Sequence, residues 1–253
     1  MSVYFTALHP LFGRGKKPLG IAYQQRSPYY WWWAFLRRNE RYLACCERNG
    51  EGELSELYSA FKDVRNDNFK EWSTRKTDIP KLSLGAFLFG EQQIALTLKE
   101  LERRDEWRED WRQDSVLVIA ASLSISKKRL KALFNKLLKK RHTRTRGRKS
   151  FAELTRESTA RFKLYQVADT HALGIQLRVF DACTANVKVG SPKTLAEIGI
   201  ELGLMPSARP KAGDDKREIA RKRIIMAAAV SRYYRQARKI VGNTSLGIFP
   251  KPS

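Results

Sequence analysis

The sequence predicts a mostly α-helical fold with a small β component. Apolar residues recur three and four positions apart in several stretches, which is the period of one buried helix face. Residues that commonly begin helices precede these stretches, as Ser27 and Pro28 do. The clearest part of the β component is a short, continuous run rich in β-branched residues, 115–121, which is typical of a buried strand.

Composition and patterning divide the chain into three expected parts. The 253 residues contain 42% hydrophobic and 11% aromatic residues, enough for a real core, so global disorder is excluded. We expect a helical, aromatic-rich N-terminal module over 1–90. A central unit over 91–150 holds an acidic helix, the buried strand, and a basic helix with a basic arm. A helical, helix-turn-helix-like region with a long basic helix fills 151–253.

The segment 126–149 contains twelve basic residues and no acid, about half of the formal net charge of +23. The part before Arg141 predicts an amphipathic helix with Leu133 in the core. The part from Arg141 onward has no large apolar residue and predicts a solvated arm. A solvated helix face is the ordinary alternative, but such faces usually mix lysine with glutamate. We therefore expect phosphate binding by these side chains: Lys127, Lys128, Arg129, Lys131, Lys136, Lys139, Lys140, Arg141, Arg144, Arg146, Arg148 and Lys149.

The N-terminal module is expected to form an aromatic core. One helix is predicted from Ser27 to Cys46, with Trp32 on its buried stripe. Three consecutive tryptophans, Trp31 to Trp33, cannot all face one side, so at least one should meet another segment, a partner or a base. A short buried segment at 84–91 is predicted as a strand. Further along, Asp63, Asp67 and Glu71 have the spacing of metal ligands, but the bases among them favour a surface ion-pair network.

The C-terminal region contains a second concentration of positive charge. Residues 194–204 resemble the first helix of a helix-turn-helix, but the loop at 205–213 is longer than the turn of that motif. Asp214 or Asp215 then caps a long helix with nine bases and one acid between 216 and 239. Such a helix either reads bases in a groove or clamps the backbone, and the long loop favours the clamp. The expected contacts are Arg217, Arg221, Arg232, Arg235 and Arg238.

Charge and residue usage narrow the class of partner. An isoelectric point near 10.2 indicates that the partner is nucleic acid or, less readily, an anionic membrane surface. A membrane-surface protein needs a helix that combines a basic face with a free apolar face, and we see none in the sequence. No apolar run approaches the ~20 residues that span a bilayer, and no secretory signal is evident. Three cysteines without metal spacing fit a reducing, cytoplasmic compartment and predict neither a metal nor a cofactor.

Two N-terminal segments, SPYYWWWAFLRRNERYL and FKDVRNDNFKEW, look like those of poorly characterised, transcriptional-regulator-like proteins of bacterial mobile genetic elements. Later segments are similar in the same order: LRVFDA, TLAEIGIELGL, RYYRQARKI and GIFP. The resemblance implies a bacterial cytoplasmic protein of a mobile element or a defence system, with DNA binding.

The sequence thus predicts a non-catalytic nucleic-acid-binding protein, either a DNA-binding regulator or a subunit that holds DNA or RNA with other proteins in a nucleoprotein complex. The alternative is a metal-independent nuclease or RNA-processing enzyme in which His142, within the basic arm, acts as general base. No phosphate-binding glycine loop, catalytic triad or paired-carboxylate pattern supports that alternative.

Overall fold

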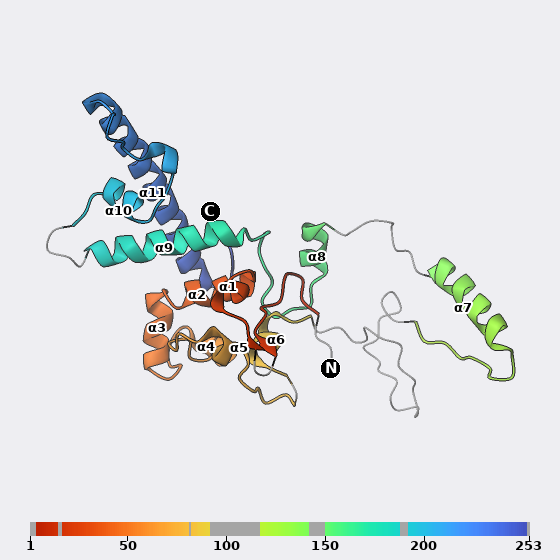
Figure 1. Cartoon of the computed structure of the whole chain (residues 1–253). Coiled ribbons are helices and arrows are strands. Elements are labelled where there is room, and N and C mark those ends of the chain that lie inside the picture. The colour runs from red at the N-terminus through yellow and green to blue at the C-terminus, as the bar shows by residue number, and fades with distance from the viewer. Residues whose placement is uncertain are drawn as a thin grey trace. The chain divides into compact units, whose positions relative to one another are not determined.

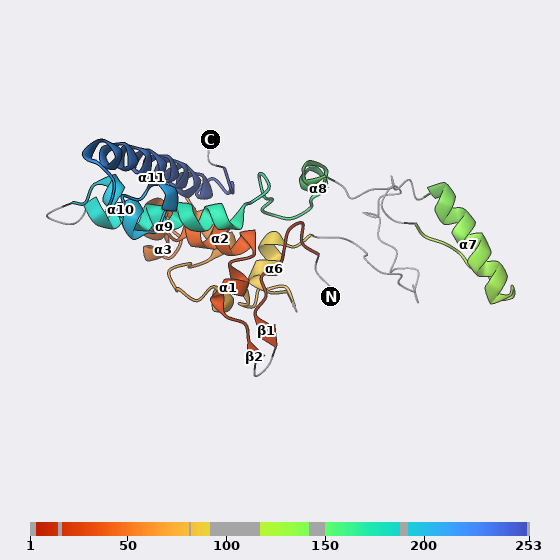
Figure 2. The same ribbon diagram turned by 45° about the horizontal axis from the view of Figure 1, so that its top comes forward.

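The structure is a computed structural model, and it describes residues 4–14, 17–80, 82–91, 117–141, 150–187 and 192–251. The described part is mostly helical, with one two-stranded antiparallel hairpin (Figures 1 and 2). Its elements are β1 (Gly13–Arg14), β2 (Lys17–Pro18), α1 (Ile21–Gln24), α2 (Pro28–Leu36), α3 (Glu40–Glu47), α4 (Ser55–Phe61), α5 (Phe69–Ser73), α6 (Leu84–Phe89), α7 (Lys127–Arg141), α8 (Phe151–Glu157), α9 (Thr170–Val187), α10 (Leu195–Glu201), the 3-10 turn η2 (Pro206–Ala208) and α11 (Lys216–Thr244).

The chain forms two units, and the larger one joins both ends of the sequence. Residues 3–92 and 151–253 make up this unit, and 93–150 form the other. One hydrophobic cluster contains Trp32 and Phe61 together with Ile240 and Phe249. The predicted separation of 1–90 from 151–253 is therefore wrong, because the two stretches bury their apolar side chains in a common core.

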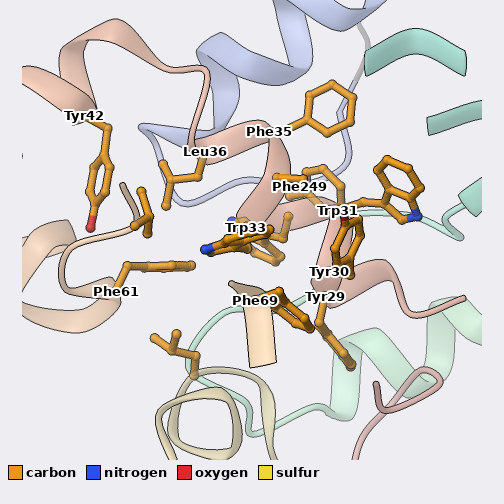
Figure 3. Packing of buried hydrophobic residues seen from close by; sticks show 14 of the residues in the cluster. Tyr29, Tyr30, Trp31, Trp33, Phe35, Leu36, Tyr42, Phe61, Phe69 and Phe249 are labelled. Atoms are coloured by element: carbon orange, nitrogen blue, oxygen red, sulfur yellow. The ribbon is translucent and has the colours of Figure 1, made fainter. Parts of the chain in front are cut away.

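Helix α2 lies at the centre of that core. Every residue from Pro28 to Leu36 is buried, so this helix is apolar on all sides. Trp31 and Trp33 leave it toward opposite sides (Figure 3). The Trp31 ring lies against α9 at Gly174, where an added Cβ would come within 3.1 Å of the ring. Trp33 lies near Phe69, with ring centroids 5.3 Å apart. The aromatic core is thus confirmed, and each tryptophan meets a different segment of the same chain.

The long N-terminal helix predicted from Ser27 to Cys46 is two helices. Ser27 caps α2 as expected, accepting a hydrogen bond from the Tyr29 amide. The chain then turns at Asn39, whose side chain accepts from the Tyr42 amide at 3.1 Å and donates to the Val241 carbonyl at 2.7 Å. Asn39 therefore begins α3 while binding the last turns of α11, which a continuous helix would prevent.

Both predicted strands differ in the structure. Residues 84–89 form α6, because the Ser83 hydroxyl accepts from the Ala86 amide as a helix cap. Residues 117–121 are irregular and exposed rather than a buried strand, with Leu117 41% exposed. Ser115 and Val116, also part of that prediction, lie outside the described residues.

Three C-terminal helices pack together in the larger unit (Figure 2). The side of α10 that faces α11 carries Gly199, where a Cβ would stand 2.6 Å from Met226 and 2.9 Å from Val230. A glycine at this place lets the two helices approach closely. A second cluster, which includes Val179, Ile198 and Met226, fills the space between α9, α10 and α11.

The buried carboxylate of Glu91 accepts hydrogen bonds from residues that precede and residues that follow the smaller unit in the sequence. Glu91 accepts hydrogen bonds from the Ser158 hydroxyl at 2.6 Å, from the Thr159 amide at 2.6 Å and hydroxyl at 3.0 Å, and from the Thr6 hydroxyl. Burial by itself raises the pKa of Glu91, but these hydrogen bonds outweigh it and hold the pKa below its ordinary value of 4.5. The carboxylate thus holds residues 158–159 beside residue 91, where the chain leaves the larger unit.

The lowered pKa gives a pH-dependent contribution to stability. Because the folded pKa lies below the unfolded one, the Glu91 contribution is present above about pH 4.5 and is lost as pH falls through the folded pKa. We expect Glu91→Gln to lower the free energy of unfolding by about 1–3 kcal/mol at pH 7. Urea melts of both proteins from pH 7 to pH 3 measure this, and the difference should narrow below pH 4.5. A difference that stays constant over the whole range would contradict a charged, hydrogen-bonded Glu91.

Candidate nucleic-acid interface

The exposed face of α11 carries a row of basic side chains. Arg217, Arg221, Arg232 and Arg235 are exposed, and Lys239 follows four residues after Arg235 on the same face. The steps of four, eleven and three residues each return close to the same side of a helix with 3.6 residues per turn. From the first to the last, this row spans ~33 Å at about 1.5 Å per residue. We call these five residues, with the neighbouring exposed Arg238, the α11 stripe.

The members of the α11 stripe differ in how they are held. Arg221 donates to Glu218 at 2.9 and 3.0 Å, so part of its charge is already balanced. The guanidinium carbon of Arg232 lies 5.4 Å from the centroid of Tyr233, and that of Arg238 lies 5.9 Å from Tyr234. These cation–π contacts orient the two guanidinium groups and leave their N–H groups available.

Charge in the stripe is largely unpaired. Within the described residues, no ion pair joins a carboxylate to Arg217, Arg232, Arg235 or Arg238. By contrast Lys222, on the packed side of α11, is buried and bonds to Asp214 at 2.7 Å. Positive groups at the surface therefore remain free for an external anion, while the inward one has its own partner.

The connection from α10 to α11 departs from a helix-turn-helix. Thr194 and Glu197 form a capping box at the start of α10. The chain then runs from Leu202 to Asp215 through η2 before α11 begins, far longer than a turn of three or four residues. Of the two predicted caps, Asp215 is the one that caps α11, accepting from the Glu218 amide at 2.7 Å.

Helix α7 also has a basic face and an apolar face, and its basic residues Lys127 to Arg141 are all exposed. Its apolar residues are not buried: Leu133 is 51% exposed, and Leu130, Phe134, Leu137 and Leu138 are half-buried. The prediction that Leu133 belongs to the core is therefore wrong. The same observation removes our reason for setting aside an anionic membrane surface, because α7 does combine a basic face with a partly free apolar face.

Several predicted site residues lie outside the described part of the chain. They are the arm residues Arg144, Arg146, Arg148 and Lys149, and also His142. Lys239 is a stripe residue that our prediction missed, although its spacing of four from Arg235 was a sufficient signal. Helices α7 and α11 belong to different units, and each is described by itself.

The acidic candidates form ion pairs and hydrogen bonds. Asp63 accepts from Arg65 at 2.6 Å, and this bond lowers the pKa of Asp63. Glu71 accepts from Asn66 at 3.0 Å. Among the described residues, no three potential ligands gather as a metal site. Cys45, Cys46 and Cys183 are free and buried, and burial raises the pKa of the Cys46 and Cys183 thiols.

No family model, curated protein or solved structure matches this chain. Over the part of the chain that the structure describes, no helix carries the long apolar stretch that crossing a bilayer requires. The function must therefore be argued from the α11 stripe and from α7.

Proposed function

We propose that this chain is a non-catalytic nucleic-acid-binding protein that holds the phosphate backbone. The observation that carries the proposal is the α11 stripe: cationic side chains on one exposed helix face, most of them without a carboxylate partner among the described residues. Arginine guanidinium groups match phosphate oxygens with two N–H donors at once, and the formal net charge of +23 favours a polyanion such as nucleic acid.

The length of the stripe suits a backbone. Its ~33 Å is close to one turn of B-form DNA, roughly 34 Å. A straight row of cations of this length lies along a duplex and contacts the phosphates on that side without entering the groove deeply. Packing of α11 against α9, α10 and α2 leaves one face open, and the long connection from α10 to α11 favours a clamp over a recognition helix. We infer that affinity comes from phosphates and that sequence preference is weak.

Helix α7 adds a second group of phosphate contacts in this proposal. It carries eight bases and no acid in fifteen residues. Together with the resemblance to regulator-like proteins of mobile elements, the charge distribution favours a bacterial nucleoprotein component, which binds DNA or RNA as a regulator or as a subunit of a complex.

The clamp is tested with the variant Arg232→Ala/Arg235→Ala/Arg238→Ala. We expect weaker binding to every duplex and a salt dependence flatter by about 2–3 units of slope, because each lost phosphate contact removes about 0.9. Fluorescence anisotropy over a salt series measures this. A matched variant, Arg48→Ala/Lys70→Ala/Lys76→Ala, removes the same charge from exposed positions of the N-terminal part and should change the slope little.

Binding-site selection decides between clamp and recognition helix. A clamp leaves the selected sequences unchanged in the triple α11 variant, since phosphates carry no sequence information. A consensus that changes at one base position, with non-specific affinity preserved, would instead show that an arginine reads a base edge. Equal affinity of parent and triple variant for every DNA and RNA tested, with the fold intact, would refute the proposed function.

A further inference from the structure

A groove of about 540 Å³ opens in the larger unit between α1, α2 and α9. This volume lies within the range of small-ligand sites, roughly 300–1,000 Å³. Three arginines and one histidine line it together with the carboxylate of Asp181: Arg26, Arg38, Arg178 and His171. These residues lie far apart in the sequence, from position 26 to position 178, so no local sequence motif predicts the groove.

One wall of the groove is apolar and firmly built. Trp31 and Tyr30 form it, with ring centroids 5.0 Å apart at 90°. The Trp31 ring contacts the backbone of α9 at Gly174, and its Nε1 donates to the Gln25 carbonyl at 2.7 Å. Figure 3 shows the Trp31 ring on the α9 side of α2. Both side chains are only 8% exposed, so the wall offers a ligand a small, fixed apolar edge.

The cationic side is also partly preorganised. Arg38 donates to Asp181 at 2.8 and 3.1 Å and to the Ala34 carbonyl at 3.0 Å. These three bonds fix its guanidinium and leave two of its five N–H groups. Arg26 is exposed, with its guanidinium carbon 4.9 Å from the Tyr23 ring centroid, and Arg178 is exposed on α9. Three guanidinium groups against the single lining carboxylate leave an excess of positive charge.

We propose that this groove binds a nucleoside monophosphate unit. The guanidinium groups of Arg26 and Arg178 take the phosphate, and the wall of Tyr30 and Trp31 takes the base or the sugar. An apolar aromatic edge in the same groove as two exposed arginines fits a phosphate attached to a ring better than a free inorganic anion. The unit is either a free nucleotide or the 5′-phosphorylated end of a strand. The second source rests on the proposed function, in which α11 of the same unit holds the strand.

The test uses AMP as the free ligand, and a single-stranded DNA oligonucleotide with either a 5′-phosphate or a 5′-hydroxyl. Calorimetry measures AMP binding, and anisotropy measures the two oligonucleotides. The groove variants are Arg26→Ala and Arg178→Ala, which remove exposed charges, and Ala22→Trp, which fills the groove without changing charge. Arg48→Ala is the matched control outside the groove, and melting curves verify that each variant folds.

We expect AMP to bind the parent and the control, with a loss of about tenfold or more for each arginine variant. Ala22→Trp should abolish binding. A preference for the 5′-phosphate that disappears in the same variants identifies the strand end as the source. AMP binding without that preference identifies the free nucleotide, and both results support the groove.

Equal AMP affinity in the parent and all folded groove variants, or no AMP binding and no 5′-phosphate preference in the parent, would overturn the proposal. The two proposals fail separately. If the groove binds no AMP, salt-dependent duplex binding by the α11 stripe is still expected. Conversely, AMP binding that the groove variants remove would stand even if no nucleic acid binds α11.

Discussion

Replacing Trp32 by alanine is expected to lower the free energy of unfolding by about 3–5 kcal/mol. The indole is 0% exposed, and its ring centroid lies 5.3 Å from those of Phe89 and Phe249. Removing it opens a cavity between α2, α6 and the C-terminal tail, which a packed core closes only in part. The melting temperature should fall by roughly 6–20 °C, and thermal and urea melts measure both quantities.

Two control variants separate cavity formation from other causes. Trp32→Phe keeps a ring and removes a buried Nε1–H that finds no acceptor within the described residues, so its cost should be much smaller. Leu133→Ala removes a half-exposed side chain of α7 and should change stability by about 0.5 kcal/mol or less. A Trp32→Ala protein that melts like the parent but no longer binds nucleic acid would place Trp32 on a binding surface instead.

Replacing the last arginine of α7 and three arginines of the basic arm together by alanine is expected to weaken nucleic-acid binding strongly. These are Arg141, Arg144, Arg146 and Arg148. If each contacts one phosphate, the salt dependence of binding should flatten by about 3.6 units of slope. The melting temperature should stay nearly constant, because this segment has no large apolar residue to contribute to a core.

The matched control changes the same four arginines to lysine. Lysine keeps the charge that releases counterions but loses the paired N–H donors, so the salt slope should persist while affinity drops moderately. Binding of the protein to vesicles of anionic phospholipid tests the other anionic partner that suits α7, a membrane surface. If the alanine variant binds DNA and RNA as tightly as the parent, the arm makes no phosphate contact, and the α11 stripe and α7 would carry the proposed function without it.

The sequence determined most local features of this protein. Caps at Ser27 and Asp215 begin helices as predicted, because a side-chain oxygen that accepts from the first free amides acts within four residues. The spacing of bases on α11 likewise follows from the helical period alone. The mostly helical architecture and the clustering of positive charge could therefore be predicted from the sequence.

The tertiary structure decided whatever depends on distant contacts. The tryptophans from Trp31 to Trp33 are all buried because segments from both ends of the chain surround α2, and Asn39 divides a predicted helix because it also binds Val241. Leu133 is half-exposed, although the spacing of apolar residues in its helix predicts burial. An amphipathic pattern identifies the apolar face of a helix but does not show whether another segment covers that face. The groove at Arg26, Arg38 and Arg178 forms between α1, α2 and α9. Burial and proximity between remote residues are properties of packing, and no local pattern encodes them.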